Sequence, residues 1–198
     1  MKTLFPLLTL LVFLCAGFAP ATETATYDVI LFGDKVGNMV VTHQTLADGK
    51  ESYLLQSNVK AKILWIDKEV VSRMEAIFKD GKLLTSNYSE VENGEKKRWY
   101  NVNLTGNVYT ADGFKGKRTI TQPIPYTVVT SYFKDLRKVT RVFDEAECDF
   151  VDLAHPEPDT WEFKSGGRGR NVFHSVNGVV KFVEFHASIA SVKFIRTR

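Results

Sequence analysis

The sequence predicts a mainly β protein, a single antiparallel meander of about a dozen strands curled into an open or closed barrel. Turn pairs such as Asn-Gly and Asp-Gly recur about every ten residues, and they favour tight hairpins. The segments between these turns are rich in Val, Ile, Thr, Tyr and Phe, the residues that strands prefer. Because long antiparallel sheets tend to curl, split or close, this many strands favour a barrel-like shape.

Thirteen strands are expected, eight before residue 125 and five after it. Their ranges are 26–32, 38–46, 51–62, 69–79, 82–92, 95–104, 107–111, 117–122, 138–143, 160–164, 170–176, 179–187 and 189–195.

Two-residue turns also predict which residues face each other across three hairpins. A turn at Asn93-Gly94 pairs Tyr88 with Trp99 and Glu90 with Lys97. The other two turns lie at Asp80-Gly81 and Asn177-Gly178, and they predict four further pairs: Phe78 with Leu83, Ile77 with Leu84, Phe173 with Phe182, and Val172 with Val183.

The last of these hairpins carries apolar residues on both of its predicted faces. Val172 and Val183 lie on one face, whereas Phe173, Val180 and Phe182 lie on the other. Such a strand pair needs cover on both sides, from a helix, a second sheet or a ligand.

One segment has helical spacing. Apolar residues at 128, 129, 132, 133 and 136 form one stripe after Pro125, and Arg137-Lys138 suit a helix C-terminus. A short amphipathic helix is therefore expected near 126–136, with a buried strand as the alternative.

The N-terminus has the pattern of a secretory signal peptide over residues 1–21. A charged start precedes an apolar run from Leu4 to Phe18 and a small-residue site at Ala19-Pro20-Ala21. This pattern predicts an export-machinery substrate that is periplasmic or secreted, with a single β-rich domain over 22–198. Lipid anchoring at Cys15 is a weaker alternative, because the residues before Cys15 are large.

Composition excludes several classes of protein. The chain has 26 Lys+Arg against 23 Asp+Glu, a net charge of +3, which is too balanced for a nucleic-acid partner. After cleavage only Cys148 would remain of the two cysteines, so the exported domain could form no internal disulfide. We expect this thiol to be buried.

No catalytic residue, metal ligand or cofactor is predicted. The pattern Gly-x-Ser-x-Gly and the usual metal-binding spacings are missing from the sequence. The predicted register places His174 and His186 on opposite faces, so they share a metal only if a bulge intervenes. A hydrolase assembled in space from His43, His155, His174 or His186 stays an alternative.

Three charged segments have ordinary structural interpretations. Gly166-Gly167-Arg168-Gly169-Arg170 is expected to be a flexible hairpin loop with two exposed arginines, which would meet an anionic group if the loop is functional. The acidic stretch from Asp144 to Asp159 is expected to be a solvated loop. The basic clusters at 96–98 and 115–118 are expected on a solvated strand face.

The most informative apolar run is Ile63-Leu64-Trp65-Ile66, which stands where a polar turn is expected. A buried strand is the favoured interpretation. The alternative is an exposed lip, and Leu64, Trp65 and Ile66 are then the candidate ligand-binding residues.

Three stretches carry a resemblance to known proteins: Tyr27…Gly33…Val36-Gly37, Asp80-Gly81-Lys82-Leu83…Ser86, and Arg170-Asn171-Val172-Phe173…Asn177-Gly178. With them, the layout of residues 27–198 resembles exported bacterial β-rich proteins of unknown function, which implies no established activity. The chain is more loosely similar to periplasmic lipoprotein-carrier half-barrels, in which a curved sheet holds acyl chains.

These observations favour a non-enzymatic cell-envelope protein that binds an apolar ligand, such as a lipid, or an envelope protein partner on its curved sheet. A structural or accessory envelope protein without a small ligand is the first alternative, and the hydrolase is the second.

Overall fold

The computed structural model describes residues 21–63, 65–188 and 190–198. Cys15, Leu64 and all of the expected signal peptide except Ala21 lie outside the described residues. No described helix is long and apolar enough to cross a membrane.

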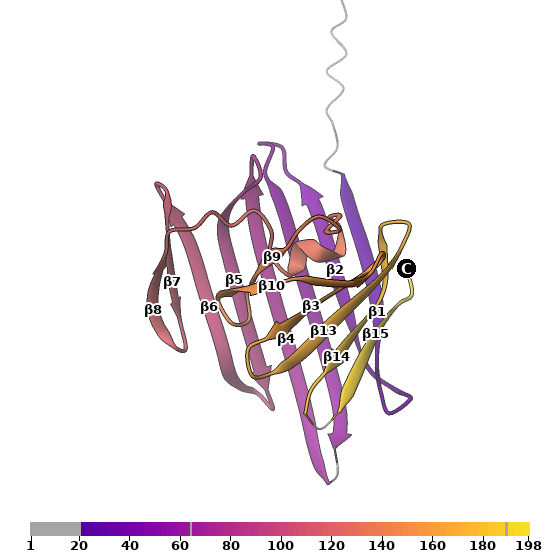
Figure 1. Ribbon diagram of the computed structural model, residues 1–198. Coiled ribbons are helices and arrows are strands. Elements are labelled where there is room, and N and C mark those ends of the chain that lie inside the picture. The colour runs from indigo at the N-terminus through magenta and orange to yellow at the C-terminus, as the bar shows by residue number, and fades with distance from the viewer. Residues whose placement is uncertain (1–20, 64, 189) are drawn as a thin grey trace, which may run out of the picture.

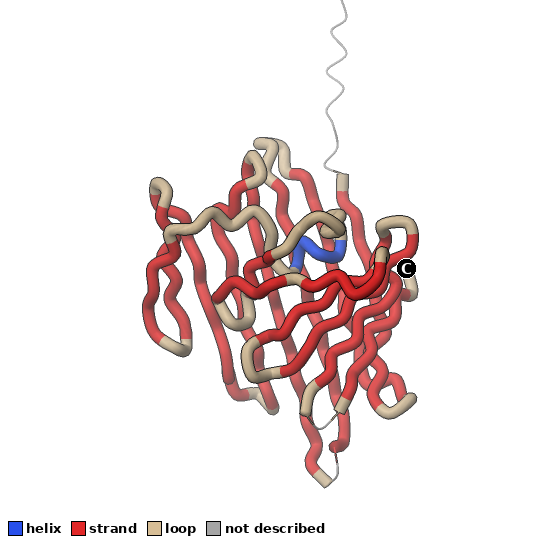
Figure 2. The backbone as a smooth tube through the Cα atoms, in the orientation of Figure 1, coloured by secondary structure: helices blue, strands red, loops and turns tan. Residues whose placement is uncertain are grey.

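The described residues form fifteen strands and one short 3-10 helix, so the predicted mainly β class is confirmed (Figures 1 and 2). The strands are β1 (Thr22–Leu31), β2 (Asp34–Thr45), β3 (Glu51–Ile63), β4 (Ile66–Lys79), β5 (Lys82–Glu92), β6 (Glu95–Thr105), β7 (Val108–Gly113), β8 (Gly116–Ile120), β9 (Arg141–Asp144), β10 (Asp149–Asp152), β11 (Ala154–Glu157), β12 (Thr160–Ser165), β13 (Gly169–Val176), β14 (Val179–His186) and β15 (Ser191–Arg196).

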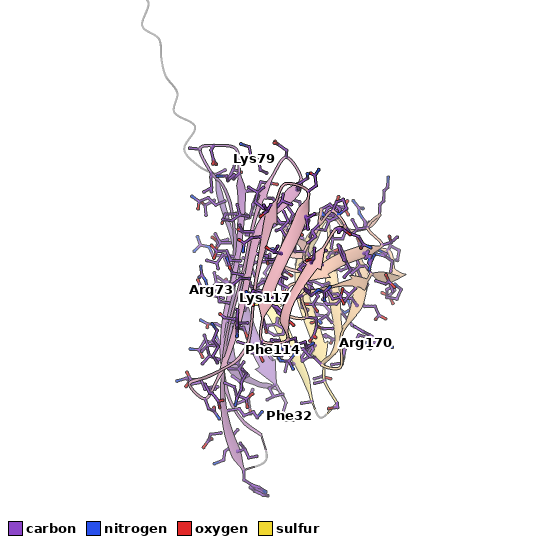
Figure 3. The ribbon with its side chains drawn as sticks, turned by 90° about the vertical axis from the view of Figure 1, so that its left-hand side faces the viewer. Phe32, Arg73, Lys79, Phe114, Lys117 and Arg170 are labelled. Carbon is purple, nitrogen blue, oxygen red and sulfur yellow. The ribbon has the colours of Figure 1, made fainter. Side chains whose placement is uncertain are left out.

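Thirteen strands form one antiparallel sheet in the order β11-β12-β13-β14-β15-β1-β2-β3-β4-β5-β6-β7-β8. The C-terminal β15 pairs with β1, which places the last strands of the chain beside the first. The sheet is open, because its end strands β8 and β11 are not hydrogen-bonded to each other. Viewed from the side, the two halves of the sheet stand opposite each other as two layers (Figure 3).

Four hairpins share one local device that curves this sheet. Each has two consecutive turn residues with positive φ, and the first of these pairs is Phe32 and Gly33. In each hairpin the register then shifts by one, which leaves one extra residue on the second strand: Val36, Leu84, Lys97 or Lys181. Such β-bulges bend a strand and increase its twist, so their repetition favours a curled sheet.

The bulges explain which predicted pairs are wrong. Phe78 faces Leu83 as expected, because this pair lies between the turn and the bulge. Beyond the bulges, the pairing moves by one residue: Ile77 faces Thr85, Tyr88 faces Tyr100, Glu90 faces Arg98, Phe173 faces Val183, and Val172 faces Glu184.

The same shift changes which apolar residues share a face of the β13–β14 hairpin, and both faces still carry apolar residues, as expected. Phe173 and Val183 are both buried and face each other, so they belong to one face. Phe182 lies beyond the bulge, where its ring stacks on His174 at 4.1 Å. The hairpin therefore buries Phe173 and Val183 on one face, and its other face keeps Val172, which is buried, and Phe182, which faces Ile195 of β15.

The concave side of the sheet is filled by the chain itself. The 3-10 helix η1 (Val129–Tyr132) and the two-stranded sheet of β9 and β10 cross in front of β2–β6 (Figure 1). Tyr132 packs edge-to-face on Tyr27 and Phe173, which come from the two halves of the large sheet. The core therefore lies between the sheet and this crossing segment.

A helix lies within the expected range 126–136, but it is shorter than the amphipathic helix predicted there. Only Val129–Tyr132 is helical, and it is a single 3-10 turn. Thr127, Val128 and Val129 are β-branched, which disfavours a long helix. The carboxylate of Glu145 accepts hydrogen bonds from the backbone N–H groups of Val128 at 2.9 Å and Val129 at 3.2 Å. This buried contact fixes the short turn in place.

Candidate functional site

The hairpin between β3 and β4 projects beyond its neighbours at the lower end of the sheet (Figure 1). β2 pairs with β3 only as far as Val59, and β5 pairs with β4 only from Val70 onward. In the outer part of the hairpin, residues 60–63 and 65–69, β3 and β4 therefore form strand pairs only with each other. We refer to this part as the β3–β4 finger.

The finger carries its largest described apolar side chains in solvent. Trp65 is 88% exposed and Ile66 is 60% exposed. The favoured interpretation of this run as a buried strand is therefore wrong for both residues, and they stand where the lip alternative placed them. These two residues are exposed because β3 and β4 continue past the strands that would have covered them.

Asn93 anchors the base of the finger. Its side-chain carbonyl accepts a hydrogen bond from the Glu69 N–H at 2.8 Å, and its side-chain amide donates to the Asp67 carbonyl at 3.3 Å. The backbone N–H of Asn93 also donates to the Glu69 carbonyl at 2.8 Å. An ion pair between Lys68 and Glu92 at 2.9 Å adds a side-chain contact. These bonds hold the finger in line with β4 and β5.

A second apolar tip lies at the same end of the sheet. Phe32 occupies the β1–β2 turn and is 72% exposed (Figure 3). Phe114, in the β7–β8 turn, is more covered, because its ring packs against Tyr100 and lies under Arg98 and Lys115. Lysines stand close to the apolar tips: Lys35 follows Phe32, and Lys60, Lys62 and Lys68 lie on the finger. This end of the sheet therefore combines exposed apolar rings with cations.

The interior of the protein has little space for a ligand. A cavity of about 170 Å³ remains between the sheet and the crossing segment, lined by apolar side chains including Met39, Met74 and Phe173. Ordinary ligand pockets measure about 300–1,000 Å³, so this space is too small for one. The concave face expected to hold a ligand is thus occupied mainly by the protein's own residues.

Polar side chains close one end of that cavity. Arg168 bonds to the carboxylate of Glu90 at 2.5 Å and to the hydroxyl of Tyr88 at 3.3 Å. The prediction of two exposed arginines is therefore wrong for Arg168, which is largely buried, whereas Arg170 is exposed and pairs with Glu162 at 3.1 Å. Arg168 already has a carboxylate partner and is not free to meet an anion.

The acidic stretch is also less solvated than expected. Asp144 and Glu145 are both buried, and the hydroxyl of Ser165 donates to Asp144. Burial raises the pKa of Asp144 and raises that of Glu145 to about 7. Both buried carboxyl groups have hydrogen-bond donors: Glu145 accepts from the backbone N–H groups of Val128 and Val129, and Asp144 accepts from the N–H of Ala146 and the hydroxyl of Ser165.

The expectation that His174 and His186 lie on opposite faces is wrong. The Lys181 bulge brings both His174 and His186 to the carboxylate of Glu184, with Nε2–Oε2 distances of 4.0 and 3.3 Å. The other ring nitrogen of His186, Nδ1, lies 2.9 Å from the hydroxyl of Ser191. Within residues 21–63, 65–188 and 190–198, no three His, Cys, Asp or Glu side chains are grouped so that they could hold a metal ion.

The remaining cysteine is buried, as predicted. Burial raises the pKa of the Cys148 thiol to about 11, and the Asp149 carboxylate contributes in the same direction. A thiol with so high a pKa is a poor nucleophile at neutral pH.

A larger cleft lies where the two ends of the open sheet approach each other. It has a volume of about 750 Å³ and is lined by Lys115–Arg118 on one side and by residues of β10 and β12 on the other. Arg118 pairs with Asp149 at 3.1 Å, and Lys115 pairs with Glu147 at 2.9 Å. We call this space the seam cleft. The basic residues that were expected on a solvated face thus line a concave site.

Together these features define an open, barrel-like β protein with an apolar end and a charged cleft between its sheet edges. The chain belongs to the family described as a domain of unknown function, DUF6134, whose model matches residues 27–197. No curated protein matches this chain.

Among solved structures, the chain is similar to a β-barrel-like protein of the domain of unknown function DUF1849 from Brucella abortus. The TM-score is 0.55 at 11% identity, with 89% of this chain and 96% of that chain covered. This likeness supports the fold and supplies no activity.

Proposed function

We propose that the protein is a non-enzymatic cell-envelope protein that binds the surface of an anionic lipid bilayer with the apolar tips at one end of its sheet. The observation that carries this proposal is the exposure of Trp65 and Ile66 at the end of a hairpin that projects beyond the sheet. Leu64, which adjoins them in sequence, is the third residue assigned to the contact.

A bilayer fits this arrangement better than a small apolar ligand does. The internal cavity of about 170 Å³ is below the size of ordinary ligand pockets. Phe32 and Trp65 instead stand on separate hairpins at the same end of the sheet, so one small molecule is a poor match for both. An extended surface can accept each tip independently.

The charges beside the tips suit anionic headgroups. On the finger, Lys60 pairs with Glu69 at 3.0 Å and Lys68 with Glu92 at 2.9 Å, so Lys62 is the finger lysine without a carboxylate partner among the described residues. Lysine stems can extend along an apolar surface while their ammonium groups stay in the headgroup region. Each lysine near an anionic membrane contributes about 1 kcal/mol, and Trp favours the interface itself.

The proposal also includes export of the protein to the cell envelope. Cleavage of a signal peptide over residues 1–21 would leave the domain periplasmic or secreted, in reach of an envelope membrane. A lipid attached at Cys15 would have the same result by a different route. In either case the finger would orient the domain on the membrane.

Vesicle flotation tests this proposal. The exported domain is mixed with vesicles of phosphatidylcholine and phosphatidylglycerol, and the bound fraction is compared with that on pure phosphatidylcholine. We expect binding to the mixed vesicles that weakens as salt is added. Trp65→Ser should reduce affinity at least about tenfold, because burying a large apolar side chain contributes about 1.5–3 kcal/mol.

Val176→Ser is the matched control, because Val176 is 52% exposed at the end of β13, away from the finger. It should leave vesicle binding unchanged. Equal loss in the two variants, or no binding of the wild type, would contradict the proposal. A co-purifying protein that needs Trp65, without vesicle binding, would favour the structural or accessory alternative instead.

A hydrolase is the second candidate, because Ser191, His186 and Glu184 form a chain of contacts at 2.9 and 3.3 Å. Ion pairing with Lys193 at 2.6 Å lowers the pKa of Glu184 and keeps it ionised. Labelling of Ser191 by a fluorophosphonate, lost in His186→Ala, would support this activity. Under the membrane proposal, no such labelling is expected.

A further inference from the structure

We propose that the seam cleft binds an extended peptide segment, which adds as a strand to the free edge of β8. The proposal concerns a different surface from the finger and does not rest on membrane binding. Three kinds of observation support it: the unpaired edge of β8, the size of the cleft, and the arrangement of charge and apolar surface along it.

β8 is the last strand of the thirteen-stranded sheet and pairs only with β7. Among the described residues, no hydrogen bond reaches the outer edge of Lys117, Arg118 or Thr119. In an antiparallel pair, every second residue directs its N–H and C=O groups away from its partner strand. The edge therefore presents the donors and acceptors that an added strand needs.

Most free edges are solvated, but this one borders a concave space. The seam cleft measures about 750 Å³, and its far wall is formed by Phe150 and Val151 of β10 and Phe163 of β12. The ion pairs Arg118–Asp149 and Lys115–Glu147 connect the two walls, and no strand ladder joins β8 to β10 or β12. The cleft is within the size range of ligand sites.

The exposed cation beside this edge indicates which peptide fits. Lys117 is the most exposed of the cleft's ion-paired cations, at 84% of its side chain, and its Asp112 partner is 3.9 Å away (Figure 3). A carboxylate on the added strand would give Lys117 a closer partner. Neighbouring residues on a strand point to opposite faces, so the residue after that carboxylate points into the cleft. There it meets Phe150 and Phe163, which favour an apolar side chain.

The geometry thus points to an extended peptide with alternating acidic and apolar residues. A suitable probe is an acetylated, amidated seven-residue peptide, Thr-Val-Glu-Val-Glu-Val-Thr. Two control peptides replace both glutamates with lysine or the central valine with proline. Proline removes a backbone donor and is poorly tolerated in a ladder, so it tests strand pairing separately from charge.

Titration calorimetry of the exported domain should show binding of the acidic peptide and no binding of the proline peptide. Lys117→Glu should weaken the acidic peptide about fivefold, as expected for a partly exposed ion pair, and should strengthen the lysine peptide by a similar factor. Lys82→Glu is the control, because Lys82 is exposed in the β4–β5 turn. It should change neither affinity.

Hydrogen exchange locates the peptide. Bound acidic peptide should slow amide exchange within Gly116–Ile120 at least about tenfold, since new ladder hydrogen bonds form there. Equal binding of the proline peptide would overturn the proposal in favour of an ordinary small-ligand cleft. Absence of binding, or protection confined to other strands, would also overturn it.

Discussion

The guanidinium of Arg118 lies 3.1 Å from the carboxylate of Asp149, and this ion pair joins two ends of the fold that no strand ladder joins. Arg118 belongs to β8 at one edge of the large sheet, and Asp149 is the first residue of β10 in the small sheet that crosses its concave face. The fold is therefore closed at this point by side chains, which leaves the backbone edge of β8 open.

The stability of the seam should depend more on Glu147 than on Asp149. Glu147 is nearly buried and accepts from Arg98 at 3.1 Å and Lys115 at 2.9 Å, whereas Asp149 is largely exposed. Glu147→Gln should lower the free energy of unfolding by about 1–3 kcal/mol, and Asp149→Asn by less than about 1 kcal/mol. Urea unfolding of both variants checks this order, and the reverse order would contradict it.

Glu145 should make stability fall as the pH rises. Burial raises its pKa in the folded protein from 4.5 to about 7, so the folded state holds a proton that the unfolded state releases. The stabilisation is fully present below about pH 4.5 and is lost as the pH rises through about 7. Its size is on the order of 3 kcal/mol. Urea unfolding between pH 4 and about 8 measures it.

Glu145→Gln isolates this contribution. The variant should lose most of the decline in stability over that pH range, because its side chain does not titrate. A remaining slope of the same sign is expected from Asp144, whose pKa is also raised by burial. An unchanged pH profile in Glu145→Gln would show that Glu145 is not the titrating group.

Gly37 should not tolerate a side chain. A Cβ atom there would lie 2.1 Å from the carbonyl oxygen of Asn58 on the adjacent β3, next to the first bulge. Gly37→Ala should therefore destabilise the protein by about 1–3 kcal/mol or more in thermal or urea unfolding. Gly167→Ala is the control, since nothing lies within 4 Å of its Cβ position. Similar losses in both variants would refute the steric explanation.

Much of the fold could be predicted because turn chemistry and strand composition are local. Asp80-Gly81, Asn93-Gly94 and Asn177-Gly178 all form the expected turns with positive φ. Long-range register could not be predicted in the same way. A bulge at Leu84 or Lys97 depends on how the whole sheet curves, and turn arithmetic carries no information about it.

The candidate sites were harder to predict, because exposure depends on neighbours that are distant in the sequence. An apolar run such as 63–66 is typical of a core, but the β2–β3 pairing ends at Val59 and Trp65 beyond it is in solvent. Strand β10 and the burial of Glu145 were missed because the acidic composition suggested a loop. The basic run at 115–118 was noticed, but its place at a sheet edge depends on the overall topology.

The most direct test of the account measures where Trp65 lies when the protein meets a membrane. The tryptophan emission of residues 22–198 is recorded with phosphatidylcholine–phosphatidylglycerol vesicles, with and without brominated lipid, and the Trp65→Phe spectrum is subtracted. We predict that the Trp65 emission shifts to shorter wavelength and is quenched by the brominated lipid, as for an indole in the interfacial region. Trp65 emission that stays at its position in water, unquenched, would contradict the proposal that this end of the sheet binds the bilayer.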